Sequence, residues 1–301
     1  MTSSSLCLPD PQRVLVHLAV LALSILIASG AAGPAVAVGE GASGDPGTRA
    51  GSRAAPDASA CARFLRSLYV PGMRLVREYP GSKVLWLSHD GLLVERALRK
   101  RDRKLARPLA KRLRESGRAE AWKLAPILTD APWTPVFREP SLLDVTQDRG
   151  FTIKTEEEKG ALAQGWEGFT DLCLFAAAGL AKTDRPEALR LYRAAFATWD
   201  GTGFLDPPAK SLGRYAAFKL ALALLVGHKL GVTVPEEARM LSILASLQTP
   251  EGGIVTDYDG RLKPIGVPNA ETTSIVLIAL DARGTQPRHG IGAKDAAPER
   301  R

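Results

Sequence analysis

The stretch Gln248-Thr-Pro-Glu-Gly-Gly-Ile-Val-Thr-Asp-Tyr258 decides how this sequence is interpreted. It has the pattern of a helix end, a glycine turn and a short extended segment, and residues 268–280 follow as a loop and a new helix. Residues 199–225 have the same pattern, with Gly203 in the place that Gly253 takes in the later copy. The repeat is therefore about 50 residues long, which is typical of helical-hairpin repeats.

The helices on either side of these turns are of two kinds. Residues 212–225 and 270–280 are apolar on nearly every side, so each must be buried. Residues 186–198 and 235–247 are amphipathic and can cover the buried helices from outside. The sequence therefore predicts pairs of helices in two layers, with the apolar partner inside.

The turns also resemble those of α/α-toroid proteins, which include terpenoid cyclase and prenyltransferase-like repeats and six-hairpin glycosidase-like proteins. The likeness is carried by Gln-x-x-x-Gly-Gly-Ile-x-x-Asp at 248–257 and by Asn-Ala-Glu-Thr-Thr at 269–273. Residues 199–206 with Tyr215-x-x-x-Lys219 look like the same turn. The resemblance implies an all-α fold, an α/α toroid of helical hairpins in two layers with short β-hairpin turns.

The resemblance covers residues 60–283, and Trp86-x-x-x-Asp90 looks like another helix start of the group. The sequence predicts fewer helices than a full six-hairpin ring has, so the ring is expected to be open or partial. It also lacks the Asp-x-Asp-Asp acid of terpenoid cyclases, the zinc ligands of protein prenyltransferases and the Gly-Cys-x-Glu-Gln thioester motif. No cofactor and no metal is therefore expected, and Asp257-Tyr-Asp-Gly260 is interpreted as a tight turn rather than a calcium loop.

In a two-layer toroid the N-termini of the inner helices converge at one end, so polar groups at these helix starts are the candidate site. The acids expected to be catalytic are Asp90, Asp171 and Glu271. The residues expected to bind the ligand are Trp86, His89, Trp166, Tyr215, Lys219, Asn269 and Thr272. Aromatic side chains stack on sugar rings, and two carboxylates across a cleft can act as acid and base in glycoside cleavage.

The structural alternative is that the same residues only stabilise the fold. Asp90 and Glu271 would then cap helix N-termini or interact with the helix dipole, each contributing ~0.5–2 kcal/mol. Asp171 would do the same, and Lys219 would be an ion-pair partner of one of these acids. The tryptophans would belong to the core.

The N-terminal part of the chain has the composition of a leader. Residues 14–27 form an apolar run behind Arg13, and Ala35-Val-Ala37 is an A-x-A cleavage pattern. Residues 1–37 are predicted to be a signal peptide or, because about 20 apolar residues can span a bilayer, an N-terminal membrane anchor. In both cases we expect an exported protein, secreted or anchored to the membrane, with its main domain outside the cytoplasm.

Composition also divides the rest of the chain. Residues 38–56, rich in Gly, Ala, Ser and Pro, are predicted to be a disordered linker. Residues 57–284 form the predicted toroid-like domain, and residues 285–301 form a predicted disordered tail. Cys61 and Cys173 could form a disulfide in an oxidising compartment or be two small buried apolar residues.

Positive charge is concentrated in one segment. The chain has a formal net charge of +8, and Arg96–Arg118 alone contains eleven Lys and Arg against two acids. Leu105, Leu109 and Leu113 give this segment one apolar stripe on a cationic helix. An anionic membrane surface is the expected partner of such a helix in an exported protein, and nucleic acid is not favoured. The alternative is a solvated outer helix.

Together these patterns predict an exported protein that binds or processes a glycan or similar polar ligand in a cleft at the inner-helix N-termini. If it is an enzyme, a glycoside hydrolase or lyase-type activity is expected. One alternative is a non-catalytic scaffold that docks partners. The other is a degenerate relative of terpenoid cyclases and prenyltransferases, which predicts a large apolar cavity that the polar helix starts argue against. The sequence does not determine the oligomeric state.

Overall fold

The computed structural model describes residues 54–87, 89–116, 124–129, 133–138, 141–157 and 160–285. The predicted leader, nearly all of the predicted linker and the tail from residue 286 lie outside the described residues. Within those ranges, none of the helices combines the length and the apolar character that crossing a bilayer requires.

The helices have the following bounds: α2 Ala58–Ser67, α3 Asp90–Leu98, α4 Arg103–Glu115, α5 Ala125–Leu128, α6 Thr170–Leu180, α7 Arg185–Phe196, α8 Pro207–Leu212, α9 Ala217–Leu230, α10 Glu237–Ser246 and α11 Ala270–Thr285. A 3-10 helix covers Trp166–Gly168. The strands are β1 Tyr69–Val70, β2 Leu75–Val76, β3 Val84–Trp86, β4 Ser141–Asp148, β5 Phe151–Glu157, β6 Tyr215–Ala216, β7 Val255–Tyr258 and β8 Pro264–Pro268.

The prediction of an all-α toroid is wrong. The protein is mixed α/β: its described residues are 51% helical and 16% strand and contain three small sheets. Strands β1 and β2 form an antiparallel pair, β6, β7 and β8 form an antiparallel sheet, and β3, β5 and β4 form a mixed sheet. In the mixed sheet Val84 is aligned with Thr152 in a parallel pair. A strand's own pattern is local, but the partner with which it pairs is not, so the sequence did not show that these distant extended segments assemble into a sheet.

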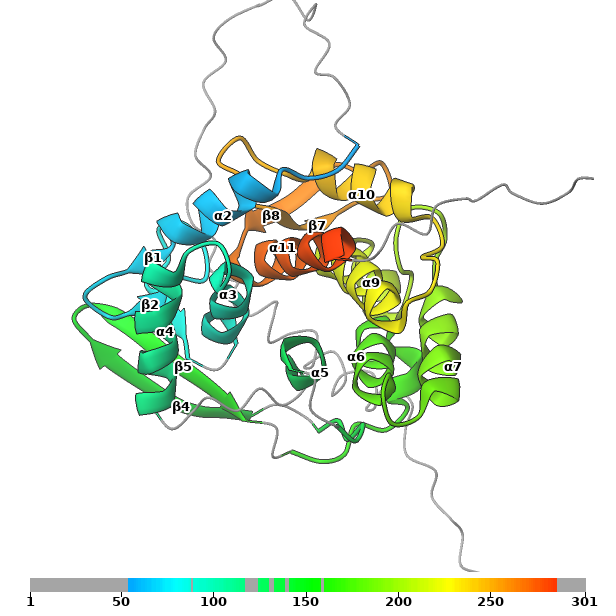
Figure 1. Ribbon diagram of the computed structural model, residues 1–301, viewed down its shortest axis with the longest axis horizontal. Coiled ribbons are helices and arrows are strands. Elements are labelled where there is room, and N and C mark those ends of the chain that lie inside the picture. Colours follow the sequence, from blue (N-terminus) through cyan, green and yellow to red (C-terminus); the bar gives the residue numbers. More distant parts are fainter. Residues whose placement is uncertain are drawn as a thin grey trace, which may run out of the picture.

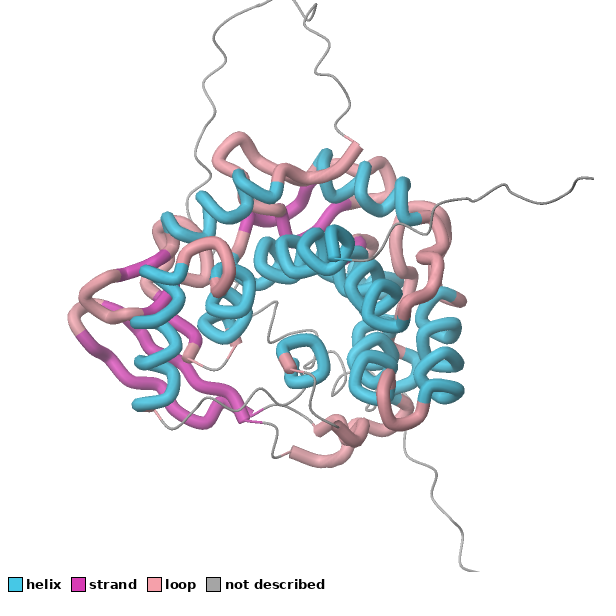
Figure 2. The backbone as a smooth tube through the Cα atoms, viewed as in Figure 1, coloured by secondary structure: helices cyan, strands magenta, loops and turns pink. Residues whose placement is uncertain are grey.

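The helices are arranged around a curved inner row of α3, α11, α9 and α6 (Figure 1). On its outer side α4 packs on α3, α2 on α11, α10 on α9 and α7 on α6 (Figure 2). The short helix α5 lies on the concave side of the row and contacts α6 and α3. Strands β6 and β8 run directly into α9 and α11, so the sheet sits at the N-terminal end of these inner helices.

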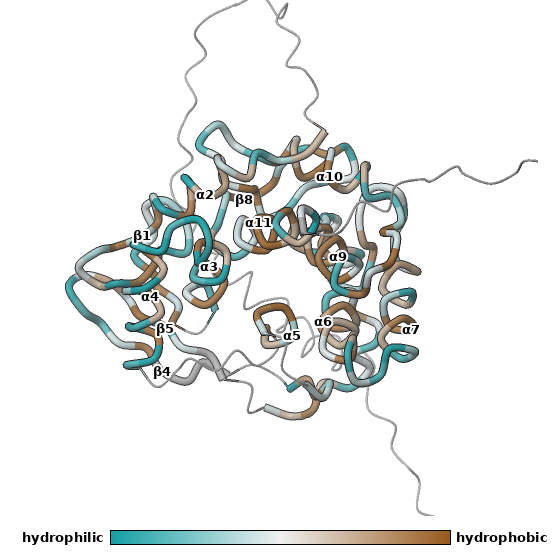
Figure 3. Tube along the Cα trace, in the orientation of Figure 1, coloured by the Kyte–Doolittle hydropathy of each residue, from teal (hydrophilic) through white to brown (hydrophobic). Residues whose placement is uncertain are grey.

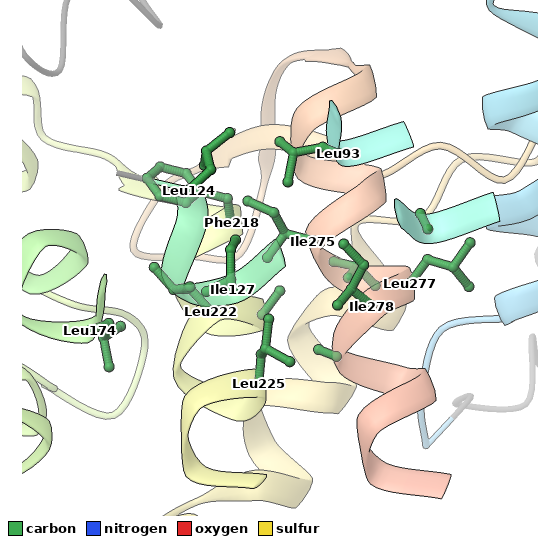
Figure 4. Packing of buried hydrophobic residues seen from close by; sticks show 14 of the residues in the cluster. Leu93, Leu124, Ile127, Leu174, Phe218, Leu222, Leu225, Ile275, Leu277 and Ile278 are labelled. Atoms are coloured by element: carbon green, nitrogen blue, oxygen red, sulfur yellow. The ribbon is translucent and has the colours of Figure 1, made fainter. Parts of the chain in front are cut away.

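The core lies along the inner row, where apolar residues gather, whereas α4 is mostly hydrophilic (Figure 3). In α9 almost every residue from Ala217 to Gly227 is buried, as its uniformly apolar sequence predicted. Phe218 and Leu222 of α9, Ile275 of α11 and Ile127 of α5 belong to one cluster (Figure 4). A buried apolar side chain contributes about 1.5–3 kcal/mol, so this cluster is the main source of stability.

The two predicted glycine turns have similar hydrogen bonds, but the later turn is one residue longer. Asp200 N–H donates to Gly203 O, and Thr249 N–H donates to Gly253 O. Both glycines are required by close packing: an added Cβ would lie 2.4 Å from the Tyr215 ring at position 203 and 2.6 Å from Phe64 at position 253. The repeat in the sequence therefore reflects a repeated local structure.

Element ends differ from the predicted ones in one important place. The apolar helix expected over 212–225 begins only at Ala217, because Gly213 has a φ of 64° and ends α8. Tyr215 and Ala216 then pair with β7.

The two cysteines are free thiols, both buried, so the disulfide alternative is not realised. Cys61 accepts a hydrogen bond from Gln248 Nε2 at 3.2 Å, and Cys173 donates to Glu167 O at 3.1 Å. Burial raises the pKa of each thiol to about 12. They act as small core residues.

Candidate functional site

The starts of the inner helices are connected to one another at one end of the molecule. Strands β6 and β8, which precede α9 and α11, both pair with β7. Ala270 N–H, at the start of α11, donates to Glu78 O at 2.8 Å, which connects α11 to the segment before α3. Lys219 of α9 lies 3.5 Å from Asp171 of α6. Side chains from four separate parts of the sequence are thereby placed at this end.

The first group of side chains, which we call the histidine–acid cluster, lies at the starts of α3 and α11. It consists of Glu78, Trp86, His89, Asp90, Lys154 and Glu271. His89 Nδ1 lies 3.4 Å from Asp90 Oδ1, and its Nε2 lies 3.4 Å from Glu271 Oε1. The imidazole therefore stands between two carboxylates that are 181 positions apart in the sequence but adjacent in the fold.

Glu78 gives this cluster its electrostatic character. Its side chain is buried, and burial together with the neighbouring Asp90 carboxylate raises the pKa of Glu78 to about 7. Lys154, His89 and a hydrogen bond from Trp86 act in the opposite direction but are weaker. Lys154 Nζ lies 5.3 Å from the centre of the Trp86 ring, within the range of a cation–π contact. Glu78 thus keeps its proton to a higher pH than an ordinary glutamate.

This raised pKa predicts a measurable pH dependence of stability. Below pH 4.5 Glu78 is protonated in both states, and between pH 4.5 and 7 only the folded state keeps the proton. The folded state then binds more protons, so its stability falls as pH rises through this window, by up to about 3 kcal/mol. The variant Glu78→Gln has no carboxyl group at this position, so its stability should not fall with pH for this reason. Urea unfolding of both proteins at pH 4.5 and pH 8 measures it, and parallel stability curves would contradict the raised pKa.

The second group, the lysine–acid cluster, joins α6, α8 and α9 through Lys219, Asp171 and Asp206. Lys219 is buried, and its ammonium bonds Asp206, whose side chain has no exposed surface, and lies 3.5 Å from Asp171. Asp206 also accepts from Thr170 N–H at 3.2 Å and caps α8 through Ala209 N–H. Burial acts to lower the pKa of Lys219, but the two carboxylates outweigh it and raise that pKa. Lys219 stays charged, which favours a positioning role over a nucleophilic one.

Several residues that were predicted to bind a ligand instead make contacts that stabilise the fold. Asn269 Oδ1 accepts from Thr272 N–H at 2.9 Å and caps α11, and the Thr272 side chain is itself buried. The Trp166 ring packs on Phe137 with centroids 5.0 Å apart. Tyr215 donates to Asp200 and stacks on Tyr258.

The candidate acids are also placed where the helix dipole favours them. Asp90 begins α3 and Glu271 is in the first turn of α11, so each interacts favourably with its helix N-terminus. The hydrogen bond that caps α11 comes from Asn269, so Glu271 is not needed as the N-cap of this helix. These acids can therefore stabilise the helix starts and still be available to a ligand.

Sequence analysis missed Glu78, Lys154 and Asp206. Asp206 stands directly before Pro207 and Pro208, the pattern of an N-cap followed by a first-turn proline, so a capping signal was available. Glu78 and Lys154 carry no such signal, because they reach the cluster through a loop and through β5.

Metal and cation sites are not evident. Among the described residues no group of three His, Cys, Asp or Glu side chains is placed to hold a metal ion. Of the Asp257–Gly260 segment, Asp257 and Tyr258 end strand β7, and a tight turn follows in which Asp259 accepts from Arg261 N–H at 2.8 Å and Lys263 N–H at 2.9 Å.

The basic segment divides into two parts. In α4 the predicted stripe of Leu105, Leu109 and Leu113 is buried, while Arg103 and Arg107 are exposed. The residues before α4, from Arg96 to Lys100, lie instead at the C-terminal end of α3. The proposed contact with an anionic membrane surface stays a prediction for the exposed face of α4.

No protein-family model, curated protein or solved structure matches this chain. The likeness to α/α-toroid proteins therefore has no matching relative to support it, and the functional argument rests on the geometry of the clusters.

Proposed function

We propose that the protein binds a neutral, hydroxyl-rich glycan at the histidine–acid cluster and cleaves it by acid–base catalysis. The observation that carries this proposal is the environment of Glu78, a buried carboxyl group whose pKa burial and the neighbouring Asp90 raise to about 7, together with the Glu271 carboxyl group 3.4 Å from His89. Carboxyl groups whose environments separate their pKa values are typical of acid and base pairs. The apolar run of residues 14–27 supports an exported location, where such glycans are found.

Each residue of the cluster has a distinct role in this proposal. Glu78 is the general acid, because burial and the neighbouring Asp90 raise its pKa to about 7, so it keeps its proton to a higher pH than an ordinary glutamate. Glu271 is the base or nucleophile, because its side chain is 10% exposed and that of Asp90 only 4%. His89 holds the two carboxylates in place, and Trp86 offers a ring on which a sugar can stack.

The charges of the cluster favour a neutral glycan over an acidic one. A uronic acid would bring a further carboxylate beside Asp90 and Glu271, and Lys154 offsets only part of that repulsion. We therefore expect neutral hexoses or N-acetylhexosamines to be preferred.

The test uses the full chain with cellohexaose, chitohexaose, maltohexaose and, as the acidic comparison, hexagalacturonate. We expect binding by calorimetry and release of reducing ends for at least one neutral probe, with turnover falling above pH 7 as Glu78 loses its proton. Glu78→Gln and Glu271→Gln should each lower turnover by a factor of about 100 or more while the protein stays folded.

Glu187→Gln is the matched control, because Glu187 is a partly exposed acid of the outer helix α7 that pairs with Arg190. Its turnover should equal that of the unchanged protein. Absence of both binding and turnover with all the neutral probes, or an equal loss in the Glu187 variant, would contradict the proposed function.

A further inference from the structure

A pocket of about 260 Å³ lies at the opposite end of the inner helices from the two acidic clusters. It is bounded by the last turns of α3, α9 and α11, and α5 lies against its apolar side. Its volume is slightly below the 300–1,000 Å³ typical of sites for drug-sized molecules, so it suits a small ligand.

The pocket wall is cationic. Arg96, Arg99 and Lys100 contribute from α3 and the turn after it, and Lys229 contributes from α9. Lys229 Nζ donates to Pro126 O and, at 3.1 Å, to Thr129 O, which fixes the ammonium against α5 at the pocket wall. Arg96 and Lys100 form no ion pair with any other described residue.

The carboxylates near this wall are already engaged. Asp281, the one acid of the lining, bonds Arg101, a residue outside the lining. Glu95, one turn before Arg99, makes two hydrogen bonds to its guanidinium at 3.0 and 2.6 Å. The lining therefore contains more cationic side chains than acidic ones, and Arg96 and Lys100 are cations that no described acid pairs with.

The negative ends of the helix dipoles offset part of this positive charge, but their partial charges are smaller than those of the side chains. The last turns of α3, α9 and α11 each present about half a negative charge, which weakens quickly with distance and with exposure to solvent. Lys and Arg side chains at such positions also stabilise the helix end itself. If the cations only stabilise the helix ends, removing them lowers the stability of the fold. If they hold a ligand, removing them lowers the affinity for that ligand, and the experiment below measures both.

The pocket lining also contains apolar residues. Ile127 of α5, Leu225 of α9 and Ile278 of α11 face the same space and are labelled together in Figure 4. A site lined by both cations and aliphatic side chains matches a molecule with an anionic group and an apolar group.

We propose that this pocket binds a small organic oxyanion, a phosphate monoester or carboxylate joined to a short apolar group. The guanidinium group of Arg96 suits the planar, bidentate recognition of such oxyanions, whereas that of Arg99 is already held by Glu95. The ligand is either a soluble molecule or the headgroup region of a lipid, and both share this chemistry. The proposal is independent of the glycan site, because the two sites lie at opposite ends of the inner helices.

The test measures binding of phenyl phosphate and phenylacetate to the full chain by calorimetry, with inorganic phosphate and phenol as partial ligands. We expect at least one of the two complete probes to bind, and inorganic phosphate and phenol to bind at least tenfold more weakly. The double variant Arg96→Gln, Lys100→Gln should lower the affinity of the complete probe at least tenfold. Circular dichroism and thermal unfolding verify that the variant is folded.

The matched control is Arg103→Gln, Arg107→Gln, which removes the same charge from the exposed face of α4, outside the pocket lining. Its affinity for the probe should stay within twofold. Vesicles of phosphatidylglycerol and of phosphatidylcholine identify the source of the ligand. Anionic vesicle binding that phenyl phosphate displaces and the pocket variant loses indicates a lipid, whereas probe binding without vesicle binding indicates a soluble anion.

Two results would overturn the proposal. One is no binding of either complete probe, together with lower thermal stability of the Arg96, Lys100 variant, which means that these cations only complement the helix ends. The other is an equal loss of probe affinity in both double variants, which means that general surface charge and not the pocket attracts the anion.

Discussion

Replacing Lys219 by methionine is expected to lower the free energy of unfolding by about 3–5 kcal/mol, the cost of removing one partner from a buried ion pair. Methionine keeps most of the side-chain volume, so the loss comes from charge rather than from a cavity. Asp206, which has no exposed side-chain surface, would be left beside Asp171 with no cation between them. Urea unfolding at constant pH measures the effect.

Two further variants separate the ion pair from other causes. Adding Asp206→Asn to Lys219→Met removes the buried charge, while the amide oxygen can still accept from Thr170 N–H, so at least half of the lost stability should return. Lys210→Met changes an exposed lysine of α8 and should alter stability by no more than about 0.5 kcal/mol. If Lys219→Met is as harmless as Lys210→Met, solvent reaches Asp206 and the cluster is not the connection between α6, α8 and α9 described above.

Gly252→Ala is expected to destabilise the protein by about 2–5 kcal/mol, combining backbone strain with overpacking. Gly252 has a φ of 100°, and an added Cβ would lie 2.2 Å from Ala60 O, a backbone atom that cannot move independently of α2. This is the glycine turn on which the N-terminal helix docks, through hydrogen bonds of 2.8 and 3.0 Å between Gln248 and Asp57.

The next turn along the chain, between β7 and β8, supplies the comparison. Gly260 has no atom within 4 Å of an added Cβ and no positive φ, so Gly260→Ala should change stability by less than about 0.5 kcal/mol. Chemical unfolding measures both variants, and limited proteolysis should show earlier cleavage near α2 only for Gly252→Ala. If the Gly252→Ala and Gly260→Ala proteins have equal free energies of unfolding, α2 does not pack against the Gly252 turn.

The part of the fold that could be predicted is the part encoded over a few residues. The turns at Gly203 and Gly253, the cap at Asp57 and the buried stripe of α4 follow from glycine spacing, capping chemistry and helical periodicity. His89 and Asp90 could be placed together because they are neighbours in the chain. The contact of His89 with Glu271 depended on the prediction that helix starts converge, and the structure brings these residues within 3.4 Å.

The remaining features depend on segments that are distant in the sequence. The parallel pairing of β3 with β5 overturned the all-α prediction, and no local pattern marks it. Glu78 acquires its raised pKa only when β3, α3 and α11 surround it. The cationic pocket arises because Arg96 and Lys100 end one helix beside the ends of two others.

The sequence by itself determined which helices must be buried, where the repeated turns fall, and which polar residues stand at helix starts, because periodicity and capping act within one or two turns of the chain. Only the tertiary structure decided which of these polar residues meet, that Lys219 is paired with Asp206, and that small sheets connect the helix starts. Burial and the proximity of charges set a side chain's chemistry, and both are properties of the packed chain rather than of its order of residues.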